Sequence, residues 1–300
     1  MEYMTIEGQF PRLGKSAVTL GKFDGVHRGH RKLIDRILEQ KKETGAAAVA
    51  VVLAFVSDRK TIYTKAERRD LLEHMGVDVL LECPLNSEIR HMKAEQFIRQ
   101  VLVGSLQASY VVVGEDFRFG FERKGTPELL RSFGKKYGFQ AEILPKEMDG
   151  DRKISSTYIR EELNRGNMEK VSQLLGCDYF VSGMVEHGRG MGHREFFPTA
   201  NLVPMSEKLL PPNGVYVTLS SFGQEIYPGI TNVGYKPTIG ENFVGVESYL
   251  FDCEKNLYGK NCTVEFKKFL RKEERFSSYE ALKDQIRKDV ERGKKYFFRD

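Results

Sequence analysis

Two histidines three residues apart stand on a glycine-rich segment that could contact phosphate groups. Residues 20–30 read LGKFDGVHRGH, with an apolar run before them and a helical stripe of apolar residues after them. A helix start offers free N–H groups and a positive dipole end to an anion, and glycines let the backbone approach it. We therefore predict nucleotide binding here, the alternative being an exposed basic helix start with two solvated histidines. The candidate residues are Gly21, Phe23, Asp24, Gly25, His27, Gly29 and His30.

A second segment places three consecutive hydroxyl side chains at another predicted helix start. These are Ser155, Ser156 and Thr157, and Arg160 follows them within one turn. Hydroxyl and backbone N–H groups can bind a triphosphate tail, and a guanidinium can hold the charge that develops on leaving pyrophosphate. Taken alone, the same residues also fit an ordinary serine-rich N-cap.

These segments must be positioned by the elements around them, and in the first half of the chain strands and helices alternate. This order predicts a parallel sheet covered by helices on both faces, with ligands bound outside the carboxyl ends of the strands. The predicted strands lie near residues 17–20, 49–55, 77–81, 110–113 and 139–144, and the helices near 65–74, 94–102 and 127–137.

After Cys177 the pattern changes to short strands separated by Gly, Pro and Asn turns. Closely spaced strands without intervening helices predict an antiparallel barrel, and a helix from about Tyr279 ends the chain. The domain boundary is expected at Asp178, giving domains 1–178 and 179–300. The predicted barrel strands are 179–185, 215–221, 226–233, 244–251 and 262–270.

Composition agrees with a globular protein that has two cores. The chain has 300 residues, 40% hydrophobic and 30% charged, and its net charge of +5 comes from dispersed basic residues, which argues against nucleic-acid binding. The N-terminus lacks a signal-peptide pattern, and no apolar run approaches the roughly 20 residues of a membrane span. We expect a cytoplasmic protein with no membrane partner, while the oligomeric state stays undetermined.

The four cysteines lack the spacing of a zinc site. They include no Cys-x-x-Cys pair, so buried free thiols are expected. Cys253 and Cys262 could face each other across two strands, but a disulfide is disfavoured in a reducing compartment.

Together the two phosphate-binding segments resemble the bacterial bifunctional riboflavin kinase/FAD synthetase family. Its first module is a nucleotidyltransferase with a His-x-Gly-His motif, and VGEDFRFG at 113–120 is similar to that module's central loop. FPTANL at 197–202 resembles the metal–nucleotide motif of the kinase module, and further segments follow in the family's order through residues 269–271. The resemblance covers nearly the whole chain. It implies a Rossmann-like α/β domain followed by a riboflavin kinase β-barrel with a C-terminal helix.

For the first module the resemblance implies that ATP adenylylates FMN, giving FAD and pyrophosphate. His27 and His30 would stabilise the phosphates in the transition state, and Mg²⁺ would neutralise the remaining charge. The pyrophosphate would be held by Ser155, Ser156, Thr157 and Arg160. Asp116 and Phe117 are expected to shape the adenine or flavin side of the site.

For the second module it implies transfer of the ATP γ-phosphoryl group to the 5′-hydroxyl of riboflavin. Glu247 is the predicted general base, and Thr199 and Asn201 would ligate Mg²⁺ on the nucleotide. Without the family resemblance, Glu247 would be interpreted as a solvated strand residue and residues 198–201 as a turn. The resemblance also assigns Gly188 and Gly192 to nucleotide binding, and Asn232 and Arg271 to flavin binding.

Two departures from the family pattern leave alternatives open. Residues 54–59 read AFVSDR where the family carries Thr-Phe-x-Pro-His-Pro, so a phosphate-binding histidine is missing and Asp58 or Arg59 stands nearest its place. Phe196 replaces a glycine before the kinase motif, and His193 and Glu195 are also atypical. The alternatives are an enzyme with one working module, the FAD synthetase being favoured, or a flavin-binding regulatory protein without turnover.

Overall fold

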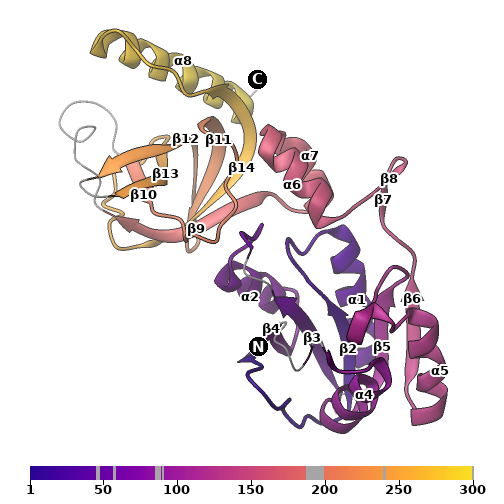
Figure 1. Cartoon of the computed structure of the whole chain (residues 1–300). Coiled ribbons are helices and arrows are strands. Elements are labelled where there is room, and N and C mark those ends of the chain that lie inside the picture. The colour runs from indigo at the N-terminus through magenta and orange to yellow at the C-terminus, as the bar shows by residue number, and fades with distance from the viewer. Residues whose placement is uncertain are drawn as a thin grey trace. The chain divides into compact units, whose positions relative to one another are not determined.

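The computed structural model describes residues 1–44, 48–56, 59–84, 89, 91–186, 199–238 and 241–298. The chain packs into two compact units (Figure 1). The first comprises Met1–Arg59 with Thr64–Ser156, and the second Lys60–Tyr63 with Thr157–Asp300. The chain thus leaves the first unit at Ser156. The module boundary expected at Asp178 stays a prediction about the catalytic modules.

A six-stranded parallel sheet forms the centre of the first unit, in the order β1-β4-β3-β2-β5-β6. The predicted α/β class is therefore confirmed for this half of the chain. The strands are β1 (Glu2–Thr5), β2 (Ser16–Gly21), β3 (Val49–Val56), β4 (Val79–Pro84), β5 (Ala108–Gly114) and β6 (Gln140–Leu144).

The helices of this unit follow the predicted alternation. The segment predicted as one helix at 94–102 is α-helical in its first turn and π-helical afterwards. The elements are α1 (Arg28–Thr44), α2 (Lys65–His74), α4 (Ala94–Phe97), the π-helix η1 (Ile98–Ser105), the 3-10 turn η2 (Phe121–Arg123) and α5 (Pro127–Tyr137), followed by the hairpin β7 (Met148–Asp149) and β8 (Arg152–Lys153).

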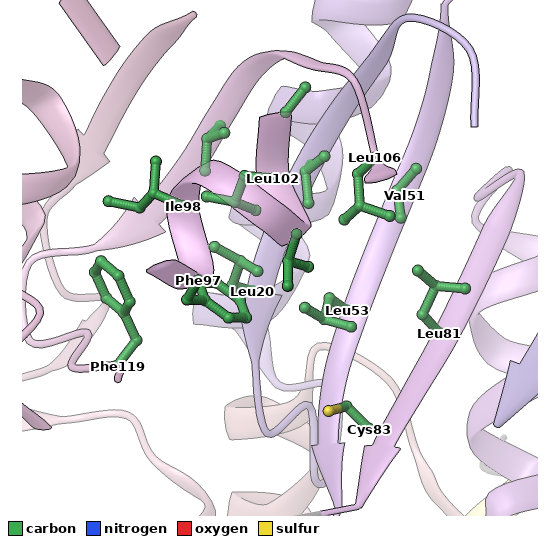
Figure 2. Packing of buried hydrophobic residues seen from close by; sticks show 14 of the residues in the cluster. Leu20, Val51, Leu53, Leu81, Cys83, Phe97, Ile98, Leu102, Leu106 and Phe119 are labelled. Atoms are coloured by element: carbon green, nitrogen blue, oxygen red, sulfur yellow. The ribbon is translucent and has the colours of Figure 1, made fainter. Parts of the chain in front are cut away.

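Both faces of the sheet are buried, because successive strand residues point to opposite sides. On one face, Leu20, Val51 and Leu53 pack in a cluster with Phe97 of α4 and Leu102 of η1 (Figure 2). The other face packs against α1 and α2, whose contributions include Ile34, Ile37 and Leu72. Both faces are therefore largely apolar, and polar groups that a ligand can reach are expected where the strands end.

One ion pair is buried between the sheet and α2. Glu82, near the carboxyl end of β4, is fully buried, and it pairs with Arg68 of α2, whose side chain is 3% exposed. The Tyr3 hydroxyl donates to the other carboxylate oxygen at 2.9 Å. A buried carboxylate and guanidinium lose their hydration, so each depends on the other to offset that cost.

The second unit is built around a closed antiparallel barrel, as predicted. Its strands follow the order β10-β13-β12-β11-β14-β9, and pairing of β10 with β9 closes it. They are β9 (Tyr179–Glu186), β10 (Thr199–Leu202), β11 (Gly214–Phe222), β12 (Glu225–Thr238), β13 (Glu241–Leu250) and β14 (Asn261–Lys272). The strand β10 was not predicted, since only four residues carry it.

Three helices complete this unit. They are α6 (Ser156–Arg165), α7 (Met168–Leu175) and α8 (Tyr279–Phe297). Helix α8 begins at the Ser278 N-cap, whose side chain accepts from the Ala281 N–H. Its apolar side chains Val290 and Phe297 pack against the barrel.

Replacing Glu82 by Gln should destabilise the first unit, because the Arg68 guanidinium would remain buried without a counter-charge. We expect the free energy of unfolding to fall by about 3–5 kcal/mol in urea denaturation. The double variant Arg68→Met/Glu82→Gln should recover a large part of that loss. Glu95→Gln, which breaks the exposed pair with Lys136, serves as the control and should change little. A wild-type midpoint for Glu82→Gln would contradict this account.

Candidate active sites

The turn between β2 and α1 holds its backbone in an uncommon conformation. Phe23, Gly25 and Val26 have φ values of 47°, 89° and 40°. A positive φ is unusual for a bulky or β-branched residue, and such strain persists only where surrounding packing enforces it. Phe23 and Val26 are both fully buried in the core below the turn. The turn is therefore fixed to the sheet before any ligand binds.

The two histidines of this turn stack on each other. Their ring centroids are 3.7 Å apart with an interplanar angle of 18°, and the His30 backbone N–H donates to Nδ1 of His27 at 3.4 Å. Since Nδ1 of His27 accepts this bond, a neutral His27 carries its hydrogen on Nε2. A Cβ added to Gly29 would lie 3.2 Å from the His27 ring, so glycine permits the stack.

Burial keeps both imidazoles neutral. Desolvation lowers the pKa of His27 to about 4, although the negative charges of Asp24 and Asp116 oppose the shift. Desolvation, followed by the proximity of His27, also lowers the pKa of His30 well below its usual range. Neutral rings on a helix N-terminus offer N–H donors and a positive dipole end to an anion.

The hydroxyl segment does reach this turn. The Ser156 hydroxyl donates to the backbone carbonyl of Asp24 at 2.6 Å, and Ser155 precedes it directly. Glu147, which precedes this segment, pairs with Arg28 of α1 at 2.6 Å and also with Lys32. Two nearby cations, Lys32 above all, lower the pKa of this carboxyl.

Sequence reasoning missed Glu147. It lies 119 residues from Arg28 along the chain, and only the fold brings them together. A single glutamate before the short hairpin of β7 and β8 carries no local signal of such a pairing.

The loop after β5 contributes the residues expected near the flavin or adenine. Asp116 pairs with Lys153 of the hairpin at 3.5 Å. Phe117 stacks on Phe119, with ring centroids 5.5 Å apart, and packs against the core. The structure thus supports a well-anchored loop, and its ligand contacts remain a prediction.

Two residues predicted to hold pyrophosphate fall in the second unit. Thr157 is exposed near the start of α6. The guanidinium of Arg160 donates to the carbonyl of Lys60 at 2.6 Å, and both residues belong to that unit. Their placement relative to the histidines stays a prediction.

In the barrel, the predicted kinase residues meet across neighbouring strands. Glu247 of β13 is directly paired with Asn201 of β10 on one side and with Asn232 of β12 on the other. Residues opposite one another in antiparallel strands project from the same face. The Thr199 hydroxyl donates to Glu247 Oε1 at 2.7 Å, and the Asn201 amide lies 3.4 Å from that hydroxyl.

Arg271 stands at the far end of the same cross-strand row. Asn232 is paired with Val215 of β11, and Val215 with Arg271 of β14. Sequence reasoning missed two carboxylates beside this row. Glu273 accepts from Asn232 at 3.4 Å, and Asp289 of α8 binds Arg271 at 2.7 Å. One feature of the sequence pointed to Asp289, because this charged residue falls among the apolar residues on one side of its helix.

Several predicted residues lie outside the described part of the chain. These are Gly188 and Gly192, the atypical His193, Glu195 and Phe196, and Asp58. Of the 54–59 segment, Ala54 is buried in β3, and Arg59 is exposed.

Among the described residues, no three His, Cys, Asp or Glu side chains come together as a metal-binding group. The oxygens of Thr199, Asn201 and Glu247 are nonetheless the hard ligands that Mg²⁺ prefers, and it commonly retains waters and binds substrate phosphates alongside few protein ligands. The donor set on the barrel therefore fits this ion. No described helix is sufficiently long and apolar to cross a membrane.

Comparison with known proteins matches the two halves of the chain to two different families. Residues 10–158 match the FAD synthetase family, and residues 175–297 match the riboflavin kinase family. A crystal structure of a Streptococcus pneumoniae chain, described as a macrolide-efflux protein, has the same fold with a TM-score of 0.85. It is 29% identical and covers 96% of this chain and 97% of its own.

Two curated bacterial relatives match over nearly their full length. The bifunctional riboflavin kinase/FMN adenylyltransferase of Escherichia coli K12 is 34% identical over 96% of this chain and 95% of its own. The protein of that description from Bacillus subtilis is also 34% identical, over 94% and 93%. The chain therefore belongs to the bifunctional riboflavin kinase/FMN adenylyltransferase family, which phosphorylates riboflavin to FMN and adenylylates FMN to FAD.

Proposed function

We propose that FMN adenylylation takes place at the turn between β2 and α1, in module 1–178. An FMN phosphate oxygen attacks the α-phosphorus of ATP, the bond from that phosphorus to the bridging oxygen breaks, and pyrophosphate leaves. No protein nucleophile is needed. The stacked pair of His27 and His30 at a helix N-terminus is the observation that carries this assignment.

The neutral histidines act in this proposal as hydrogen-bond donors. Each ring contributes one N–H, and the fixed donors need not reorganise while charge builds on the phosphates. Gly21, Phe23, Asp24, Gly25 and Gly29 form the backbone surface for the nucleotide. Pyrophosphate is held by Ser155, Ser156, Thr157 and Arg160, and the flavin or adenine side is shaped by Asp116 and Phe117.

We further propose that the barrel row carries riboflavin phosphorylation, in module 179–300. Glu247 accepts the proton of the riboflavin 5′-hydroxyl as its oxygen attacks the γ-phosphorus of ATP and ADP leaves. The Thr199 hydroxyl orients that carboxylate through the 2.7 Å hydrogen bond. Asn232 and Arg271 bind the flavin, and Gly188 and Gly192 the nucleotide.

Thr199 and Asn201 are the proposed Mg²⁺ ligands. A hydroxyl has one hydrogen and two lone pairs, so Thr199 can donate to Glu247 and still coordinate a cation. The bound ion neutralises phosphate charge during transfer.

We also propose a cytoplasmic location, supported by the cysteines. All four are free, and burial raises the pKa of Cys83 and Cys262 to about 12. Such thiols are inert and need no disulfide partner.

The two activities should separate by mutation. Glu247→Gln removes the proposed base, and we expect FMN formation from riboflavin to fall by at least about a hundredfold, the range of general-base effects. FAD formation from supplied FMN should be retained, which shows that the first module is intact. The measurement is chromatographic separation of riboflavin, FMN and FAD after incubation with MgATP. Unchanged FMN formation would remove Glu247 from the role of base.

His27→Asn should give the opposite pattern. Loss of the ring donor should lower FAD formation from FMN by about a hundredfold, while FMN formation continues.

The same chromatographic assay of the wild-type protein also tests the one-module alternatives. FAD made only from FMN would place a defect in the kinase module, and FMN without FAD would place it in the first module. Tight flavin binding without turnover would favour the regulatory reading.

The protonation of His27 gives a pH prediction. Its pKa is 6.5 when unperturbed and about 4 in the fold, so the unfolded chain binds more protons between these values. The protein should therefore lose stability as the pH is lowered from about 6.5 to about 4, and His27 should account for about 3 kcal/mol of that loss. The measurement compares the pH dependence of unfolding for wild type and His27→Asn. An NMR titration with His27 protonating near 6.5 would contradict the burial argument.

A further inference from the structure

The side chain that α8 buries most completely is a charged one. Within Tyr279–Phe297 the buried residues are Asp289 and Gly293, and Asp289 is 1% exposed. The apolar side chains of this helix are less fully covered, including Val290 in the contact with the barrel. Burial of a carboxylate is costly unless other groups satisfy it, so the position calls for a specific partner.

That partner is Arg271 of β14. Its Nε lies 2.9 Å from Asp289 Oδ2, and its Nη2 lies 2.7 Å from the same oxygen. The Gln285 amide, one turn earlier on α8, donates to Asp289 Oδ1 at 3.0 Å. Two adjacent nitrogens of a planar guanidinium held by one carboxylate fix the orientation of that plane. We call this arrangement of Asp289, Gln285 and Arg271 the carboxylate clamp.

The clamp leaves some of the N–H groups of Arg271 available to hydrogen-bond a ligand. A guanidinium has five N–H groups. One on Nε and one on Nη2 serve Asp289, and one on Nη1 donates to the Lys272 carbonyl at 3.0 Å. Two N–H groups remain without a hydrogen-bond partner among the described residues, and the guanidinium lies over the Phe276 ring at 5.8 Å. They lie at the end of the row that contains Glu247 and Asn232.

We propose that Asp289 is a positioning residue for riboflavin phosphorylation, acting by orienting Arg271 toward an acceptor oxygen or nitrogen of the flavin. This inference rests on the proposed assignment of Arg271 to flavin binding. Asp289 does not touch substrate. Its carboxylate fixes the guanidinium plane before riboflavin binds, so that binding orders fewer side-chain torsions.

A purely structural role for Asp289 would consist of attaching α8 to the barrel. Val290 supplies a matched control, because its side chain packs against the barrel cluster of Val215, Ile230 and Phe251 from the neighbouring position on α8. Val290→Ala weakens that attachment without removing a clamp residue. A role in attachment alone would make Asp289→Asn and Val290→Ala resemble each other.

The test measures riboflavin kinase kinetics of the full chain with riboflavin varied at saturating MgATP. Asp289→Asn should raise KM for riboflavin on the order of tenfold, the size expected for a charge-assisted hydrogen bond, and change kcat less. Val290→Ala should leave that KM within about twofold of wild type. FAD formation from FMN should be unchanged in both variants and controls for the integrity of the first module, while Val290→Ala controls for the attachment of α8.

A double-mutant cycle shows whether Asp289 acts through Arg271. Arg271→Lys keeps the charge but loses the planar fork, so Arg271→Lys/Asp289→Asn should be no worse than Arg271→Lys alone. Additive effects, or equal KM values for Asp289→Asn and Val290→Ala, would overturn the inference.

The assignment of Arg271 itself is tested separately by Arg271→Gln. If this variant keeps the wild-type KM for riboflavin, the proposed flavin contact fails. If its KM rises while that of Asp289→Asn does not, only the positioning role fails.

Discussion

The burial of both faces of the parallel sheet constrains the whole of the first unit. Strand residues such as Val18 and Val52 are fully covered, so both faces are largely apolar and closed to a ligand. Functional groups must emerge where the strands end, and the turn after β2 is one such place. Phe23 and Val26 of this turn are held at positive φ by the side chains they bury, which makes the geometry of the turn a consequence of core packing.

The same burial sets the chemistry of the histidines. Removing an imidazole from water disfavours its charged form, so the stacked rings are neutral donors rather than fixed cations. Bound phosphates would favour the charged form again, because opposite charges raise a histidine pKa. The turn therefore combines neutral donors with the dipole of α1, and it carries no fixed positive charge on its histidines.

In the barrel, the equivalent constraint is strand register. Asn201, Glu247, Asn232 and Arg271 share one face because β10, β13, β12, β11 and β14 are paired in a fixed alignment. A shift of one residue in any pairing would move its side chain to the other face. Helix α8 adds a second constraint from outside the barrel, since Gly293 allows close approach to Ile230 and Phe251 and Asp289 fixes Arg271.

The sequence by itself determined the alternation of strands and helices, the change to a barrel after Cys177, the glycine-rich turn and the hydroxyl helix start. Each of these features depends on the hydrophobic periodicity or the residue types of a short segment, so it can be recognised from residues that are close together in the sequence. Only the tertiary structure decided that Glu147 meets Arg28, that Thr199 donates to Glu247 and that Asp289 clamps Arg271. It also decided that His27 is neutral. These properties depend on groups brought together from distant parts of the chain and on the exclusion of water around them, and neither has a local signature in the sequence.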